Sequence, residues 1–207
     1  MHRVLQFRRA TRLVEYVRNI APRLFVQELA ARPGAVGAIC PSSRYLAAHM
    51  ARQVPLDGGL VVELGGGTGA ITQALLAHGV RPADLLVVEH SSAFVQRLRN
   101  RFSHLDIVQG DAADLARLVP PGRKISAIVS SLPLCSLPPA KTRAILRQWQ
   151  ELLAPEGRAI QFTYSLRTPE WRRHLPASRT HSKIVWANLP PANIMTFSFG
   201  SPQPSPP

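Results

Sequence analysis

The feature that most constrains this chain is a glycine-rich stretch directly after a short apolar run. The apolar run is Leu60–Leu64, and glycine follows at positions 65, 66, 67 and 69. Glycines after a buried strand let the backbone adopt positive φ angles and pass close beneath a ligand. From this point to about Thr163, short apolar runs alternate with helical patterns. That rhythm predicts an α/β fold, with a mostly parallel central sheet and helices on both faces.

The apolar runs and helical patterns place the expected elements. Five strands are expected, each bounded by Gly, Pro or Asp: Leu60–Leu64, Asp84–Glu89, Asp106–Gln109, Ile125–Ser130 and Ala159–Thr163. Three helices fit between them: Ala70–His78, Ser92–Phe102 and Pro139–Leu153. We expect Pro155–Gly157 to end the last helix. Beyond Thr163 the pattern is weaker, and Lys183–Trp186 and Ile194–Phe199 are expected as two closing antiparallel strands.

Length and charge narrow the classes of protein that fit. The chain has 207 residues, enough for one α/β domain with a short appendage, and 45% are hydrophobic, which excludes wholesale disorder. Lys and Arg number 25 against 12 acids, giving a formal charge of +13, and all but three of the basic residues are arginine. Arginine binds phosphates, so nucleic acid or anionic lipid is the expected partner, unless a GC-rich genome explains the bias. Two cysteines and scattered histidines predict no disulfide framework and no metal site.

Three regions follow from composition. Residues 1–54 are basic and read as amphipathic helices, residues 55–200 as the α/β domain, and residues 201–207 as a proline-rich tail that we expect to be disordered. No secretory signal or transmembrane run is visible, which predicts a cytoplasmic protein. A basic amphipathic helix can lie among lipid headgroups, which predicts a membrane contact and a lid over the site. The alternative is a helix packed on its own domain with a solvated basic face.

Three carboxylates stand at the ends of the first three expected strands. They are Glu63, Glu89 and Asp111. Each alone is explained as a cap for the helix that follows. Three in succession beside a glycine loop favour a cofactor, and an acid at the end of the first strand suits one that carries positive charge. The loop is neither the dinucleotide fingerprint nor a P-loop.

The stretch Glu63–Gly69 resembles motif I of the class I S-adenosylmethionine-dependent methyltransferases. The resemblance implies a Rossmann-like fold and S-adenosylmethionine as cofactor. It also implies that Glu89 accepts hydrogen bonds from the ribose hydroxyls, and that Asp111 binds the adenine amine. The cofactor-binding residues that follow are Glu63, Gly65, Gly66, Gly67, Thr68, Gly69, Glu89, His90, Asp111, Ala112 and Ser130.

The turn after the fourth expected strand, Ser130–Leu134, bears on the acceptor. It is similar to the turn with which amine-directed methyltransferases orient a nitrogen. In the rRNA adenine dimethyltransferases an aromatic residue of this turn stacks on the flipped base. Here Ser131 replaces the usual amide and Leu134 the aromatic residue, which argues against a nucleobase.

Further segments resemble the bacterial phospholipid N-methyltransferases. They are Gly37–Ser43, Gln161–Tyr164 and Asn188–Ala192. The resemblance implies an enzyme that methylates phosphatidylethanolamine, and its mono- and dimethylated forms, towards phosphatidylcholine. Its partner would be an anionic membrane surface, with peripheral association at the inner face of the membrane.

The expected catalytic residues orient the amine and accommodate its product. Ser131, Leu132 and Pro133 would position the nitrogen, while Tyr164 and Tyr45 would form an aromatic cage for the cationic product. His90 and His174 are candidate proton acceptors. More ordinary roles remain open, with Tyr45 partly in the core and His90 as a loop residue. An adenine-dimethylating RNA methyltransferase, or an inactive membrane-binding protein with this fold, are the competing hypotheses.

Overall fold

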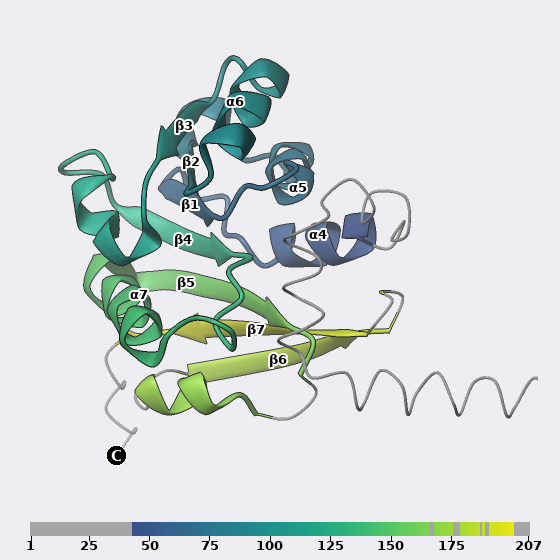
Figure 1. Cartoon of the computed structure of the whole chain (residues 1–207), viewed down its shortest axis with the longest axis vertical. Coiled ribbons are helices and arrows are strands. Elements are labelled where there is room, and N and C mark those ends of the chain that lie inside the picture. Colours follow the sequence, from purple (N-terminus) through teal and green to yellow (C-terminus); the bar gives the residue numbers. More distant parts are fainter. Residues whose placement is uncertain (1–42, 166–167, 176–178, 187, 189–190, 201–207) are drawn as a thin grey trace, which may run out of the picture.

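The computed structural model describes residues 43–165, 168–175, 179–186, 188 and 191–200 (Figure 1). The predicted N-terminal amphipathic helix and the proline-rich tail lie outside these residues. Seven strands form one sheet in the order β3-β2-β1-β4-β5-β7-β6. Their bounds are β1 Leu60–Leu64, β2 Leu85–Glu89, β3 Asp106–Gln109, β4 Ile125–Ser130, β5 Leu153–Thr163, β6 Arg179–Val185 and β7 Ala192–Ser198. Strands β1 to β5 are parallel, while β7 runs antiparallel to both β5 and β6.

Helices cover both faces of this sheet, as the alternating pattern predicts (Figure 1). The described residues form four α-helices, which are α4 Ser43–Ala51, α5 Ala70–His78, α6 Ser92–Arg101 and α7 Pro139–Leu152. Short 3-10 turns are η1 Pro82–Asp84, η2 Ala112–Arg117 and η3 Glu170–His174. One buried cluster joins the sheet to α4, α5 and α6, and the other joins it to η2, α7 and η3. Because α4 packs into the first cluster, it belongs to the same core as the sheet.

Some details of the predicted elements are wrong. No turn separates the last helix from its strand, because β5 begins at Leu153, directly after α7. The predicted stop at Pro155–Gly157 lies instead within β5, where the pairing with β4 shifts register between Ile125 and Ala127. The closing strands also begin earlier than expected. The first five residues of β6 are exposed, so their polar sequence hides an edge strand from a search for apolar runs.

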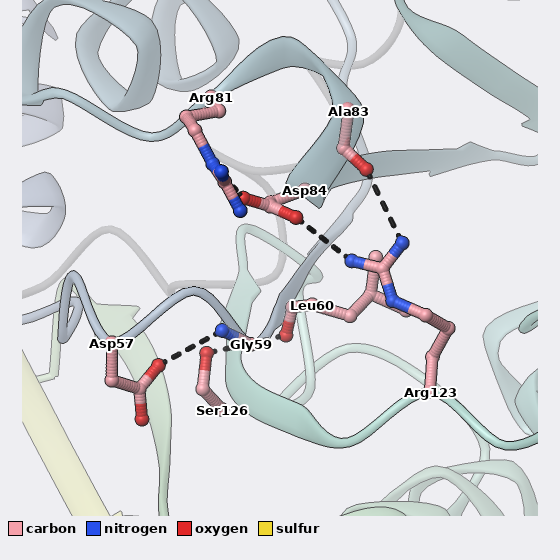
Figure 2. A network of polar contacts seen from close by, with 8 residues as sticks. All are labelled: Asp57, Gly59, Leu60, Arg81, Ala83, Asp84, Arg123 and Ser126. Carbon is pink, nitrogen blue, oxygen red and sulfur yellow. Dashed lines mark hydrogen bonds and ion pairs between the residues drawn. The ribbon is translucent and has the colours of Figure 1, made fainter.

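A polar network ties together the amino end of the sheet (Figure 2). Asp84 accepts hydrogen bonds from Arg81 at 2.5 Å and from Arg123 at 2.9 Å, and the hydrogen bond from Arg81 is the main reason that its pKa is lowered. Asp84 therefore lies in η1 rather than in β2, where we expected it. A pocket of about 340 Å³ opens at this edge beside Leu56 and Gly58. Asp84, which lines this pocket, is already paired with the two arginines. The pocket also lies where β1 begins, whereas the glycine loop follows the residue at which β1 ends, so the pocket is separate from the loop.

Candidate active site

The glycine loop takes a shape that only glycine allows. Gly65, Gly67 and Gly69 have φ angles of 81°, 50° and 82°. Gly66 is required for space, because a Cβ there would lie 2.6 Å from a side-chain carbon of Val87. At Gly67, by contrast, the nearest atom to a Cβ is 4.0 Å away. The loop is therefore packed tightly underneath and has open space above Gly67, as a cradle for a ligand requires.

Glu63, at the end of β1, is fully buried and only half satisfied. Its Oε2 accepts a hydrogen bond of 2.7 Å from Thr72 Oγ1, whereas its Oε1 has no partner. Burial raises the pKa of Glu63 to about 8, although the hydrogen bond from Thr72 opposes the shift. An unpaired buried carboxylate oxygen next to a glycine cradle fits a ligand that carries positive charge. This acid is the strongest sign that the site fits a cationic cofactor.

Glu89, at the end of β2, fixes the loop from the side. Its Oε2 accepts 3.0 Å from the Gly67 backbone N–H, and its Oε1 accepts 2.8 Å from the Ser91 N–H. The second contact lies at the N-cap residue of α6, so the expected capping role is also present. Among the neighbouring loop residues, His90 and Thr68 are exposed. Neither side chain is paired with Glu89 in the hydrogen bonds described here.

Asp111, after β3, has a partner that sequence reasoning missed. Its Oδ1 caps η2 by accepting 3.0 Å from the Ala113 N–H, and its Oδ2 forms a 2.6 Å ion pair with Lys141. Burial tends to raise its pKa, but these two contacts outweigh burial and lower it. Lys141 stands in the first turn of α7, where the helix dipole disfavours a cation. A lysine in the first turn of a helix is therefore the signal in the sequence that could have predicted an acidic partner for Lys141.

The turn after β4 is locked to the glycine loop. Ser131 Oγ donates to the carbonyl of Gly65 at 2.6 Å, and the backbone N–H of Leu132 donates to Ser130 Oγ at 3.3 Å. Leu134 is only 4% exposed and packs in the core, so this position presents no side chain to the site edge. The backbone of this turn and the side chain of Ser131 therefore line this part of the carboxyl edge of the sheet.

Gln161, on β5, is a second residue that the sequence analysis missed as part of the site. It lies opposite Ser130 in the strand register and donates 3.0 Å from Nε2 to the Leu132 carbonyl. Its Oε1 is buried and has no hydrogen-bond partner. The resembling segment Gln161–Tyr164 contains it, but nothing in that segment predicts the contact with the turn after β4.

The two tyrosines of the expected aromatic cage lie in different parts of the fold, and the cage stays a prediction. Tyr164 follows β5 and packs edge-on to Phe162, with ring centroids 5.5 Å apart. Tyr45 is 61% exposed on α4, so the expectation that it lies partly in the core is wrong. Its contribution to a cage stays a prediction.

His174 lies at the wrong end of the sheet for a proton acceptor. It ends η3, which precedes β6, and its carbonyl accepts a hydrogen bond from Gln150 near the end of α7. Both segments adjoin the edge at which the parallel strands begin, and the glycine loop is at the edge where they end. The expectation for His174 is therefore wrong.

The remaining residues meet at one edge. The strand register aligns Leu64 with Ser130, Ser130 with Gln161, and Glu89 with Gln109. Ligands of open α/β sheets bind outside this carboxyl end. No group of three or more His, Cys, Asp or Glu side chains is placed to hold a metal ion within the part of the chain that the structure describes.

The sequence is similar to those of known methyltransferases. A family model described as a methyltransferase domain matches residues 61–157. Over 147 residues the chain is 33% identical to the ornithine lipid N-methyltransferase of Singulisphaera acidiphila, covering 68% of this chain and 76% of that protein. It is 35% identical over 85 residues to the ribosomal RNA small subunit methyltransferase A of Agrobacterium fabrum, covering 38% of this chain and 30% of that protein.

The fold is also found among solved structures. TrmN from Thermus thermophilus superposes with a TM-score of 0.63 at 20% identity, over 76% of this chain and 50% of that one. This chain thus spans half the length of that structure, and the likeness shows the fold alone. Because the relative of S. acidiphila is covered over 76% of its length at 33% identity, the chain belongs to the class I S-adenosylmethionine-dependent methyltransferases, with S-adenosylmethionine as its methyl donor.

Proposed function

We propose that this methyltransferase acts on the amine of a lipid headgroup. The observation that carries the proposal is the turn after β4, where Leu134 is buried and Ser131 is bonded to the glycine loop. Such a turn leaves a backbone-lined edge at this position, without an aromatic platform for a flat base. The relative named ornithine lipid N-methyltransferase supports an amine-bearing lipid as acceptor. Phosphatidylethanolamine, which the sequence resemblance implied, offers the same primary amine.

The chemistry asks the chain mainly for positioning. S-adenosylmethionine, when bound, supplies a methyl group made electrophilic by its sulfonium. Once the ammonium has given a proton to water, the neutral amine nitrogen would attack that carbon in line, so that the N–C bond forms as the S–C bond breaks and the donor leaves as a neutral thioether. Holding the reacting atoms in this geometry is worth on the order of 7–11 kcal/mol of the barrier.

Specific residues are assigned to that positioning. The backbone of Ser130–Pro133, held by Gln161 and by the glycine loop, would orient the nitrogen. Tyr164, beside the end of β5, would face the charge of the methylated product. On the cofactor side, Glu63, Glu89 and Asp111 would hold the donor, with Lys141 keeping Asp111 ionised.

A lipid acceptor requires access to a membrane. None of the described helices is long and apolar enough to cross one. We therefore propose peripheral association with the anionic cytoplasmic face, supported by the formal charge of +13 and the basic amphipathic pattern of the N-terminal segment.

Transfer of label tests the proposal. The purified full chain is incubated with methyl-labelled S-adenosylmethionine and three kinds of vesicle. They carry phosphatidylglycerol with phosphatidylethanolamine, with an ornithine lipid, or alone as the amine-free control. We expect label in the lipid extract of one or both amine-bearing samples, and thin-layer separation identifies the lipid and the number of methyl groups. Absence of lipid label from all three, while the donor still binds, would contradict the lipid assignment.

RNA is the second candidate acceptor. The relative named ribosomal RNA small subunit methyltransferase A favours it, together with the excess of arginine. That match covers only 38% of this chain. Labelled structured RNA, with binding that weakens steeply as salt rises, would support this alternative.

A further inference from the structure

Exposed aromatic and basic residues belong to α4, to β6, which α4 contacts, and to the residue directly after β6. Residues 43–56 and 179–200, which include α4, β6 and β7, contain no Asp or Glu. We call the group Arg44, Tyr45, Lys183 and Trp186 the α4–β6 surface. Trp186 is 70% exposed and Tyr45 is 61% exposed. Together with Leu56, they are the large hydrophobic side chains that the described part of the chain leaves exposed.

The α4–β6 surface lies at the same edge of the sheet as the donor site. Val185 pairs with Ala192, and Thr163 pairs with the next residue of β7, so β5 and β6 end together. Trp186 directly follows the end of β6. From β1 to β6 the sheet order has four strand spacings, so with about 4.8 Å per spacing the glycine loop and Trp186 are roughly 20 Å apart.

Helix α4 begins at this edge and carries Tyr45 towards it. Its far end leads to the amino edge, where the Gln53 carbonyl accepts from Arg158 and the chain enters β1. Figure 1 shows α4 beside the end of β6 and the start of β7, and α4 contacts both strands. Burial is the main reason that the pKa of His49 is lowered, and the charges of Lys183 and Arg52 add to it. Helix and strand thus bring their basic groups close together.

We propose that the α4–β6 surface rests on an anionic lipid bilayer, with Trp186 among the headgroups and Lys183 and Arg44 on their phosphates. This inference rests on the proposed function, because a lipid acceptor must reach the carboxyl edge from a bilayer. Tryptophan and tyrosine favour the boundary between water and acyl chains. Basic side chains favour an anionic leaflet, and nothing on this surface repels one. The contact turns the donor site towards the bilayer.

The native tryptophans make the contact measurable. The chain has three, and Trp149 and Trp171 are only 0% and 5% exposed. The full chain is titrated with vesicles of phosphatidylcholine and phosphatidylglycerol, which contain no amine acceptor. We expect the Trp186 emission to shift to the blue and to be quenched by brominated acyl chains. Pure phosphatidylcholine vesicles should bind more weakly.

Substitutions assign the contact to this surface. Trp186→Ala should weaken vesicle binding about tenfold and remove the shift, because an exposed ring loses its burial at the interface. Lys183→Glu should weaken binding to anionic vesicles about tenfold relative to the wild type, and it should leave the weak binding to neutral vesicles unchanged. Leu56→Ala is the matched control, because Leu56 is 58% exposed at the opposite edge. It should bind within about twofold of the wild type.

Three outcomes would overturn the proposal. One is vesicle binding without any change in Trp186 emission, which would assign the contact to residues 1–42 or another face. Another is wild-type vesicle affinity in Trp186→Ala. The third is an emission shift with RNA but not with vesicles. These results are separate from the proposed function, because methyl transfer to detergent-dispersed amine lipid needs no docking, and docking to amine-free vesicles needs no transfer.

Discussion

Donor binding should release a proton from Glu63. This carboxyl is fully buried, its Oε1 has no partner, and its pKa is raised to about 8 from an ordinary value of 4.5. The shift corresponds to about 5 kcal/mol against the ionised form, so at pH 7 only about one molecule in ten carries the charge. A cationic ligand placed beside Oε1 reverses this preference. Binding at pH 7 should therefore release roughly 0.9 proton from this residue.

Calorimetry measures that proton directly. S-adenosylmethionine is titrated into the full chain at pH 7 in phosphate and in Tris, whose ionisation enthalpies differ. We expect the heat to depend on the buffer, and the dissociation constant to fall by up to about tenfold between pH 6 and pH 7, levelling off above pH 8. Glu63→Gln keeps the shape of the side chain but cannot ionise. It should bind more weakly and lose the proton release. S-adenosylhomocysteine, which lacks the sulfonium, should release less.

The same shift makes a prediction for stability without ligand. A raised folded-state pKa of an acid stabilises the fold below the unfolded pKa of 4.5, and that contribution is lost as pH rises through about 8. Ligand-free Glu63→Gln should therefore gain thermal stability relative to the wild type as pH rises from 5 to 9. Equal proton release from the variant and the wild type would refute the reasoning, because the proton would then come from another group.

Three further changes probe the loop, the adenine side and the amino edge. Gly66→Ala should lower the unfolding free energy by about 1–3 kcal/mol and abolish donor binding, because its Cβ would lie 2.6 Å from a side-chain carbon of the core. Gly122→Ala is the control, since Gly122 has a φ of 74° but open space around it. In chemical denaturation it should lose about 1 kcal/mol, and it should bind the donor normally. Lys141→Met should return the pKa of Asp111 towards its ordinary value, and it should weaken donor binding more at pH 5 than at pH 8. A variant that binds the donor as tightly as the wild type at both pH values would contradict the role of the ion pair. Asp84→Asn should lower the unfolding free energy, measured by urea titration, by about 1 kcal/mol at pH 7. Because the pKa of Asp84 is lowered in the folded state, the difference between variant and wild type should vanish as pH falls below 3.8. A difference that stays constant with pH would count against the ion pairs.

The sequence predicted the sheet well because its signals are local. A buried strand such as β1 is a run of apolar residues, and the glycines at 65, 67 and 69 mark the backbone angles that the loop needs. The same local logic failed where long-range contacts decide. The register shift inside β5 depends on β4, and edge strand β6 is polar because its first five residues are exposed to solvent.

In the candidate site, too, local signals were predicted and long-range contacts were missed. Three carboxylates at strand ends were found by their spacing, and the parallel register then brings their strand ends to one edge. Lys141 and Gln161 were missed because each acts on a residue about 30 positions away. The exposure of Tyr45 was also beyond the sequence, since a helical wheel does not show which side another element covers.

The most direct test of the account is a competition for the methyl group. Amine-bearing lipid vesicles and structured ribosomal RNA are offered together to the full chain with labelled donor, and the lipid and RNA fractions are counted separately. The account predicts label in the lipid headgroup, with little in RNA, and loss of that label in Glu63→Gln. Label that appears mainly in RNA would contradict it.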